Sequence, residues 1–181
     1  MQSFAEHQTF SSMSHQLFDF LYPFPGSNKW AVFDIDETIL AKTQQGRTIR
    51  IDEVFDFYSD IVKTGLKIAF VTARVHTLNN VIATMQQLSS LGFGTYSGLF
   101  MMPAEIIPSK ASISIFKAMV RANLEGGVLI NIGNNWSDLT EDTSRYLEFS
   151  NNAFYLLVED NTVLLKLPMN PSVLPTQRKF S

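Results

Sequence analysis

The stretch AVFDIDETIL at residues 31–40 constrains the fold more than any other part of the chain. Apolar residues 31–33 lead into Asp34, and Asp36 follows two positions later. An apolar run that ends in acidic residues is typical of a buried strand whose carboxyl end opens into a loop. In open α/β sheets, ligands bind beyond the carboxyl ends of the strands. The stretch therefore predicts a strand that carries two carboxylates to a candidate site.

Such a pair of carboxylates is suited to two kinds of chemistry. Two acids this close together can bind a divalent cation through oxygen ligands. They can also divide the work of catalysis, one as nucleophile and the other as acid and base. Taken alone, the stretch is equally compatible with acidic side chains that only solvate a loop.

Predicted strands and helices alternate along the chain from residue 29 onward. Apolar runs predict strands at 29–33, 66–71, 99–102, 127–132 and 153–158, and a sixth or edge strand at 163–167. Apolar residues at intervals of three and four predict helices within 51–64, 78–91 and 110–120, and a short polar helix is predicted within 139–146. This order predicts an α/β fold: a three-layer, Rossmann-like parallel sheet with helices on both faces.

The chain has 181 residues, which is the size of one domain with a sizeable core. Apolar residues at helical spacing predict an amphipathic helix in an N-terminal extension, residues 1–28. The α/β domain is expected to cover residues 29–170. Residues 171–181, which include two prolines, are expected to form a loose tail.

Composition narrows the classes of partner. The formal net charge is −3, and no basic stripe of the kind that binds nucleic acid is present, so we expect no nucleic-acid partner. The chain lacks cysteine, which excludes disulfides and thiolate chemistry. Residues 1–6 do not resemble a secretory signal, and no apolar run approaches the roughly 20 residues of a membrane span. We therefore expect a cytoplasmic protein without membrane association.

Polar residues follow four of the predicted strands at the point where each ends. They are Asp34 and Asp36, then Thr72 and Arg74 with the apolar Ala73 between them, then Lys110 at the start of the next predicted helix, and finally Asn134 and Asp138. Singly, such residues are usually helix caps, surface groups or structural ion pairs. Because the carboxyl ends of parallel strands share one edge of a sheet, the whole set is expected to converge there.

In this order the motifs resemble those of the haloacid dehalogenase superfamily of phosphotransferases. The similarity is closest to the branch that holds bacterial class B and plant acid phosphatases, and it covers about residues 29–170. DIDET at 34–38 resembles the DxDET signature, and VTAR at 71–74 resembles the second motif. GNNWSDL at 133–139 resembles the plant-type GDQWSDL, and KLPMN at 166–170 is faintly similar to KLPNPMY.

The resemblance implies a phosphatase that acts through an aspartyl phosphate on Asp34. Asp36 would protonate the leaving oxygen and later activate water. Thr72 would hold the phosphate oxygens through its hydroxyl and backbone N–H, with Ala73 beside it in the substrate-binding motif. Arg74 would either bind substrate or brace the site, and a purely structural ion pair is an equal alternative.

The resemblance also implies two kinds of cation at the site. Lys110, which is placed only by its order in the chain, would neutralise charge on the phosphoryl group, with Lys117 a less favoured choice. Mg²⁺ would be held by Asp34, the backbone carbonyl of Asp36, and the fourth motif with Asn134 and Asp138.

Asn134 departs from the family pattern, which has an acid at this place. An amide oxygen still binds Mg²⁺, but it contributes no negative charge, so weaker metal binding is expected. The alternative is a catalytically inactive relative that serves as a binding, storage or scaffold protein. Because Asp34 and Asp36 are both retained, we favour an active enzyme.

The two gaps in which the superfamily inserts cap domains are short, at residues 41–65 and 75–108. We therefore expect a minimal cap or none, and an open site for a small phosphoester or a phosphoprotein. Either a second copy of the chain in a homo-oligomer or residues 1–28 would screen it. A signalling receiver domain is less favoured because no acid follows the third strand at a suitable place. A dehalogenase is disfavoured because Asp36 supplies the acid and base of phosphoryl transfer.

Overall fold

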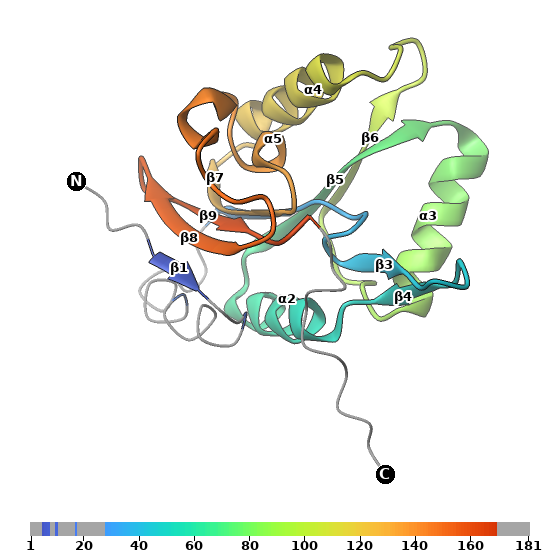
Figure 1. Ribbon diagram of the computed structural model, residues 1–181. Helices are drawn as coiled ribbons and strands as arrows, with labels where there is room; N and C mark the ends of the chain where they lie inside the picture. The colour runs from blue at the N-terminus through green and yellow to red at the C-terminus, as the bar shows by residue number, and fades with distance from the viewer. Residues whose placement is uncertain (1–4, 8–9, 11–16, 18–27, 170–181) are drawn as a thin grey trace.

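The computed structural model of the protein describes residues 5–7, 10, 17 and 28–169. Within them, a seven-stranded sheet has the order β1-β8-β9-β7-β2-β5-β6 (Figure 1). Its strands are β1 (Ala5–His7), β2 (Trp30–Phe33), β5 (Lys67–His76), β6 (Gly98–Pro103), β7 (Val128–Gly133), β8 (Phe154–Glu159) and β9 (Thr162–Lys166). A separate hairpin consists of β3 (Leu40–Lys42) and β4 (Thr48–Arg50). The helices are α2 (Asp52–Thr64), α3 (Leu78–Ser90), α4 (Lys110–Asn123), the single turn α5 (Trp136–Leu139) and the 3₁₀ turn η1 (Thr143–Tyr146).

The expected α/β architecture is confirmed. Strands β6, β5, β2, β7 and β9 pair in parallel, and only β8 and β1 join the sheet antiparallel. Helix α2 and the end of α3 pack on one face of the sheet, and α4 and α5 pack on the other. The stretches 41–65 and 75–108 contain the β3–β4 hairpin, α2, α3 and β6, and neither contains a separate cap domain.

The sixth strand expected at residues 163–167 is present as β9, and only the alternative of an edge strand is wrong. Strand β9 lies inside the sheet, parallel to β7 on one side and antiparallel to β8 on the other. Strands β8 and β9 form a hairpin whose two turn residues, Asp160 and Asn161, both have positive φ (46° and 64°). Asp and Asn tolerate this conformation better than most residues, and two-residue hairpin turns require it.

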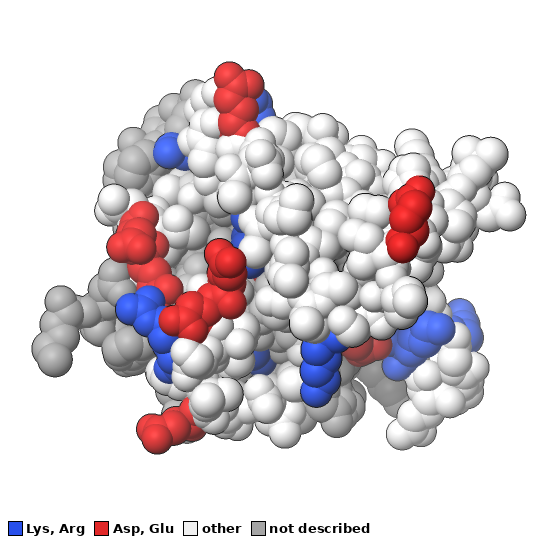
Figure 2. Space-filling model, turned by 90° about the horizontal axis from the view of Figure 1, so that it is seen from above, with Lys and Arg blue, Asp and Glu red and all other residues white. Residues whose placement is uncertain are grey.

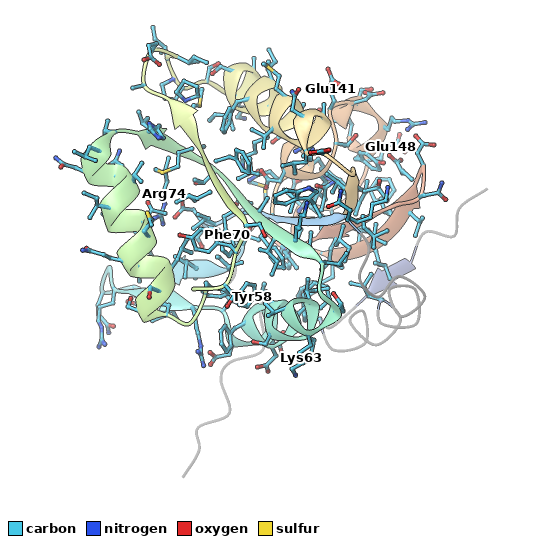
Figure 3. The ribbon with its side chains drawn as sticks, turned by 180° about the vertical axis from the view of Figure 1, so that it is seen from behind. Tyr58, Lys63, Phe70, Arg74, Glu141 and Glu148 are labelled. Atoms are coloured by element: carbon cyan, nitrogen blue, oxygen red, sulfur yellow. The ribbon has the colours of Figure 1, made fainter. Side chains whose placement is uncertain are left out.

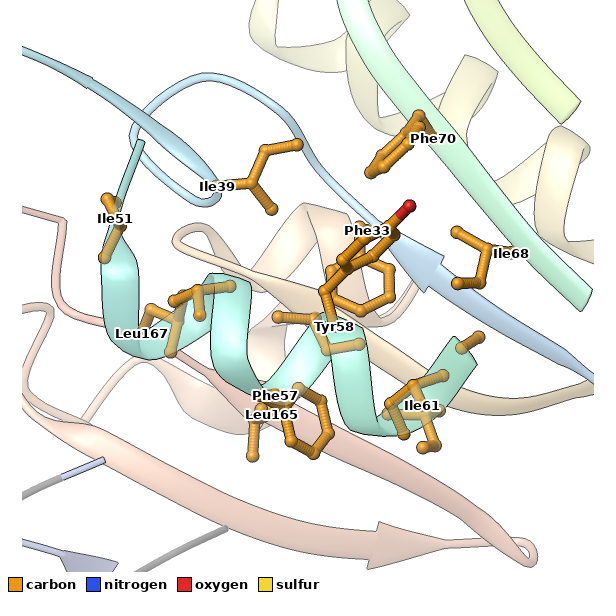
Figure 4. Packing of buried hydrophobic residues seen from close by; sticks show 14 of the residues in the cluster. Phe33, Ile39, Ile51, Phe57, Tyr58, Ile61, Ile68, Phe70, Leu165 and Leu167 are labelled. Atoms are coloured by element: carbon orange, nitrogen blue, oxygen red, sulfur yellow. The ribbon is translucent and has the colours of Figure 1, made fainter. Parts of the chain in front are cut away.

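The larger core lies between the sheet and α2 (Figure 4). Phe57 and Ile61 of α2 are buried against Phe33 and Phe70 of the central strands. On the opposite face, Val32 and its strand neighbours pack with residues of α4. Because both faces of β2 are covered, its run is apolar without alternation, as expected for a central parallel strand.

Helix ends follow local sequence signals. The Thr77 side chain accepts the backbone N–H of Asn80 at the start of α3, and Ser109 forms a reciprocal capping box with Ser112 at the start of α4. Helix α2 ends at Gly65, whose φ of 81° closes the helix in the left-handed region.

The expected helix within residues 1–28 falls mostly outside the described residues, as does the expected tail at 171–181. Strand β1, at residues 5–7, was not predicted from the sequence. Phe10 and Leu17 are buried in the core that α2 covers. Among the described residues, no helix combines the length and apolar character that crossing a membrane requires.

Candidate active site

A tight loop after β2 forms the centre of the candidate site. Asp34 continues the pairing of β2, since its N–H donates to the carbonyl of Ile132 on β7 at 3.0 Å. The carbonyl of Ile35 then accepts the N–H groups of residues 38, 39 and 40, which turns the chain back on itself. As a result the hydroxyl of Thr38 donates to Asp34 Oδ2 at 3.0 Å. Both side chains are buried, so the loop holds the Asp34 carboxylate in a fixed place.

Lys117 joins the carboxylates of Asp34 and Asp138. Its Nζ donates to Asp34 Oδ1 at 2.6 Å and to Asp138 Oδ1 at 2.5 Å. All three side chains are at most 8% exposed, so these are buried ion pairs. A single cation thus neutralises part of the charge of two acids that come from β2 and α5.

The structure places Lys117, rather than Lys110, beside Asp34. Lys110 is exposed as the first residue of α4, and Lys117 lies about two turns, or roughly 10 Å, further along the helix. Helix α4 follows a six-residue connection after β6, residues 104–109, so its first turns project beyond the edge of the sheet (Figure 1). The residue level with Asp34 is therefore one in the middle of the helix.

Burial has the largest effect on the ionisation of Asp34. It raises the pKa of this carboxyl to about 7, with a further upward contribution from the charge of Asp138 and an opposing one from Lys117. Burial alone would lower the pKa of Lys117, but the charges of Asp34 and Asp138 outweigh it and raise that pKa. Lys117 therefore stays charged while the two acids compete for it.

Asp36 points away from this buried group. Its carboxylate is 54% exposed and forms a bidentate pair with Arg74, at 2.9 Å from Nε and 2.7 Å from Nη2. Arg74 extends from β5 beside α3 (Figure 3), and its Nη1 donates to the hydroxyl of Thr84 at 3.1 Å. The arginine therefore fixes the direction of the Asp36 carboxylate.

The second motif lies where β5 loses its regular pairing with β6, between Thr72 and Val75. The buried hydroxyl of Thr72 accepts the backbone N–H of Arg74 at 3.2 Å, and Ala73 is half-buried between them. The irregularity turns the chain so that Thr72 is directed inward while Arg74 reaches Asp36.

The fourth motif supplies Asn134 and Asp138, both buried. Asn134 Oδ1 accepts a hydrogen bond from Asn135 Nδ2 at 2.9 Å. The same oxygen lies 3.5 Å from the hydroxyl of Thr38, which donates to it. Asp138 Oδ2 accepts the backbone N–H of Asn135 at 2.9 Å. Asn134 therefore belongs to the same group as Asp34, because both contact Thr38.

The donor set fits a hard divalent cation. Asp34 Oδ2 and Asn134 Oδ1 both contact the hydroxyl of Thr38, so a carboxylate oxygen and an amide oxygen lie near one another. Both oxygens of Asp138 already accept protein hydrogen bonds. Within residues 5–7, 10, 17 and 28–169, no three acidic, histidine or cysteine side chains form a metal-binding group. Oxygen ligands with only one or two carboxylates are typical of Mg²⁺ sites that keep bound water.

Gly133 allows Asp138 to approach the end of β7. A Cβ at this position would lie 2.3 Å from Asp138 Cβ and 2.7 Å from its Oδ2, which is too close for any real contact. We expect Gly133→Ala to displace Asp138 and to lower both stability, by about 1–3 kcal/mol, and activity. Urea denaturation and steady-state kinetics would measure the two effects. Gly94→Ala is the matched control because nothing lies within 4 Å of a Cβ there, and equal effects in both variants would contradict the steric argument.

Several polar residues of the site did not stand out in the sequence. Thr38 lies in the first motif but was not assigned a role, and Lys117 was only the second choice. Lys166, the first residue of KLPMN, is fully buried, donates to the carbonyls of Leu167 (2.7 Å) and Asn151 (3.3 Å), and lies over the Trp136 ring. Burial lowers the pKa of Lys166 to about 8. The similarity of KLPMN to KLPNPMY marks this lysine in the sequence but assigns it no role.

A cleft of about 590 Å³ lies beside Asp36 and Arg74. The β3–β4 hairpin forms one wall and α3 forms the other. On the face shown in Figure 2, acidic and basic side chains form small separate groups, and no stripe of one sign is visible among the described residues.

Comparisons with known proteins agree with this geometry. A family model described as HAD superfamily, subfamily IIIB (acid phosphatase), matches residues 41–157. Vegetative storage protein 1 of Arabidopsis thaliana is 26% identical over 156 residues, which cover 71% of this chain and 56% of the relative. The chain thus spans a little over half the length of that relative. The family match begins after Asp34 and Asp36, so the resemblance at the first motif rests on those residues themselves.

Proposed function

Because the chain belongs to the acid phosphatase subfamily IIIB of the haloacid dehalogenase (HAD) superfamily, we propose that it is a Mg²⁺-dependent phosphomonoesterase. The observation that carries the proposal is the buried Asp34 carboxylate, held by Lys117 and Thr38 at the end of β2 and followed closely by Asp36 at the cleft. A fixed carboxylate with a cation against it is suited to attack a phosphorus atom.

In the first step, an Asp34 carboxylate oxygen forms a bond to phosphorus while the bond from phosphorus to the alcohol oxygen breaks. Asp36 gives its proton to the departing oxygen, so that the alcohol leaves neutral. The product on the protein is an aspartyl phosphate at Asp34. Arg74 keeps the Asp36 carboxylate directed at the cleft from which the alcohol departs.

In the second step, a water molecule replaces Asp34 on phosphorus. Asp36, now ionised, takes a proton from this water as its oxygen bonds to phosphorus, and the bond between phosphorus and Asp34 breaks. Inorganic phosphate leaves, and Asp34 and Asp36 return to their starting states. Thr72, at the end of the regular part of β5, is proposed to hold the phosphate oxygens.

Lys117, rather than Lys110, is the residue that we propose neutralises phosphoryl charge. It already contacts Asp34 at 2.6 Å, and its raised pKa keeps it charged. Asp34 and Asn134, with the backbone carbonyl of Asp36, would hold Mg²⁺, and Asp138 would act through bound water. The ion would supply positive charge that offsets repulsion between the phosphate and the carboxylates.

Asn134 provides a test of this metal site. Asn134→Asp is expected to strengthen Mg²⁺ binding about tenfold, because it adds a negative charge among the proposed ligands. Without metal, the same change is expected to lower stability, because a third acid joins Asp34 and Asp138. Thermal unfolding at increasing Mg²⁺ measures both effects. Asn79→Asp, which adds the same charge at an exposed position of α3, is the control, and an unchanged Mg²⁺ dependence in Asn134→Asp would remove Asn134 from the ligand set.

The proposed function is tested by hydrolysis of phenyl phosphate with added Mg²⁺ and with excess chelator. We expect release of phosphate that requires the metal and returns when Mg²⁺ is restored. Turnover that is indifferent to chelation would contradict the metal dependence. Complete absence of turnover between pH 5 and 9, at Mg²⁺ up to tens of millimolar, would contradict the phosphatase proposal itself.

A second candidate function is that of a storage or binding protein without catalysis. Two observations favour it: Asn134 stands where the resemblance leads us to expect an acid, and the relative found by comparison is named a vegetative storage protein. Retention of Asp34, Asp36 and Lys117 in one constellation favours the enzyme, because a storage role does not require a buried ion pair around a nucleophile.

A further inference from the structure

The single helical turn α5 carries Asp138 but has few hydrogen bonds of its own to hold it in place. It comprises the four residues Trp136–Leu139 and lies against α4 and β7 (Figure 1). An isolated turn of helix is unstable, because few hydrogen bonds offset the ordering of its backbone. The last four carbonyls of a helix also lack partners within it, and in α5 these are all the carbonyls. The position of Asp138 beside Lys117 therefore depends on contacts from other elements.

Arg121 holds the backbone of α5 from the side of α4. Its Nη1 donates to the carbonyl of Asp138 at 2.7 Å and to that of Ser137 at 3.2 Å. Lys117, four residues earlier on the same face of α4, contacts the Asp138 carboxylate. Burial lowers the pKa of Arg121 to about 10, against the charges of Asp138 and Glu141, so it stays charged at neutral pH. Helix α4 thus contacts both the side chain and the backbone of Asp138.

Asn131 holds the same turn from the side of β7. It is a buried amide within the apolar strand VLINIG, and its Nδ2 donates to the carbonyl of Leu139 at 3.2 Å. Burial of an amide is unfavourable unless it is hydrogen-bonded. Among the described residues, the one hydrogen bond of this side chain goes to α5. The carbonyl of Trp136 accepts the backbone N–H of Thr140, so every carbonyl of α5 has a donor.

We propose that Arg121 and Asn131 are positioning residues that hold α5 so that the Asp138 carboxylate faces Lys117. The inference rests on the proposed phosphatase function and assigns two residues that act on hydrolysis without contacting the phosphate. Because one ammonium is shared by two acids, displacement of Asp138 also displaces Lys117 relative to Asp34. Misplacement of a catalytic group by about 1 Å is enough to lower a rate by up to about a hundredfold.

The first test compares Arg121→Met with Arg121→Lys in hydrolysis of phenyl phosphate with Mg²⁺. We expect Arg121→Met to lower kcat about tenfold or more with little change in KM, because it removes no group that binds substrate. A single nitrogen of Arg121 makes both contacts, so Arg121→Lys should recover most of kcat. Arg145→Met is the matched control, since it makes the same change at an exposed arginine of η1. Equal kcat in Arg121→Met and Arg145→Met would overturn the proposal.

The second test asks whether Arg121 acts through Asp138. If it does, Arg121→Met should lower kcat by less than about twofold in a protein that already carries Asp138→Asn, because the charge to be positioned is gone. A purely structural role would lower kcat by the same factor in both backgrounds, and that result would overturn the proposal. Asn131→Leu keeps the branched shape of the side chain but cannot donate. It should depend on Asp138 in the same way, and it covers the case in which Arg121→Met fails to fold.

A fluorescence measurement separates this proposal from the phosphatase function. Trp136 lies in α5 and stacks on Tyr146, with the ring centroids 4.2 Å apart. The chain has two tryptophans, so a Trp30→Phe background leaves Trp136 as the single emitter. In the metal-free protein without substrate, we expect Arg121→Met to increase quenching of Trp136 by acrylamide and Arg121→Lys to reverse the increase.

The two proposals fail in different ways. If no ester is hydrolysed but quenching increases in Arg121→Met and not in Arg121→Lys, the phosphatase proposal fails and the positioning of α5 by Arg121 stands. If phenyl phosphate is hydrolysed while quenching and kcat are both unchanged in Arg121→Met, the function stands and the positioning proposal fails.

Discussion

Asp34→Asn is expected to lower hydrolysis of phenyl phosphate by at least about a thousandfold. An amide oxygen cannot form the aspartyl phosphate, and loss of a nucleophile removes the covalent route as a whole. The change is nearly isosteric. With the amide oxygen in the place of Oδ1 it still accepts from Lys117, and the amide NH₂ in the place of Oδ2 can donate to the hydroxyl oxygen of Thr38, so the fold should persist. The measurement is kcat/KM on protein whose circular dichroism matches that of the wild type.

The same substitution should stabilise the metal-free protein at alkaline pH. The folded-state pKa of Asp34 is raised from 3.8 to about 7, mainly by burial, so the folded state binds this proton more tightly than the unfolded chain. Its contribution to stability is therefore present at low pH and is lost as pH rises from about 4 to about 7. Asn does not titrate, so the advantage of Asp34→Asn in urea denaturation should be small at pH 5 and larger at pH 8.

One control variant and two contradicting outcomes make the Asp34 prediction decisive. Asp60→Asn removes an acid from the exposed side of α2, where its partner is Lys63, and should leave activity unchanged. Residual turnover of more than a few per cent in Asp34→Asn would identify the wrong nucleophile, and the two-step mechanism would then be rejected. A stability advantage that shrinks toward pH 8 would contradict the raised pKa.

Lys117→Met is expected to reduce both activity and stability. It removes the cation that Asp34 and Asp138 share, and it leaves two buried carboxylates facing one another. Breaking a buried ion pair from one side costs about 3–5 kcal/mol. Loss of a charge that stabilises the transition state lowers kcat by about a hundredfold or more. Urea denaturation and steady-state kinetics with phenyl phosphate would measure the two losses.

Lys110→Met is the matched control because it makes the same chemical change seven residues earlier in α4, at an exposed position. It should leave stability within about 0.5 kcal/mol of the wild type, as is usual for surface substitutions. If Lys110→Met abolished activity while Lys117→Met did not, the assignment made from the order of the motifs would be right and the one made from geometry would be wrong.

The two lysines show how far the sequence could predict the site. Ser109 and Ser112 mark the start of α4, so the existence of the helix and its first residue follow from local signals. Which residue of α4 lies level with Asp34 depends on the path of the connection at residues 104–109, between β6 and α4. No local sequence pattern encodes that path. Lys117 was therefore harder to place than Asp34, which directly follows its own strand.

Other parts of the fold also divide into features that nearby residues predict and features that depend on partners distant in the sequence. Apolar runs predicted the parallel strands because the central runs, such as that of β2, are buried on both faces. The interior place of β9 is set by its partners β7 and β8, and the pairing of β1 joins residues about 150 positions apart. At the site, Thr38 could not be given a role from the sequence. Its hydroxyl reaches Asp34 only because the loop between them folds back, and no local pattern encodes that fold.

The position of β9 has a consequence for how the chain folds. Strand β1 pairs in the sheet with β8, and β8 joins the parallel strands through β9. The N-terminal strand therefore cannot take its place during synthesis until residues up to Lys166 have left the ribosome. Contacts this distant in sequence form slowly, and the unpaired edge of β7 stays open until they do. Interruption of the chain shortly before residue 162 would leave that edge exposed to pairing with other chains.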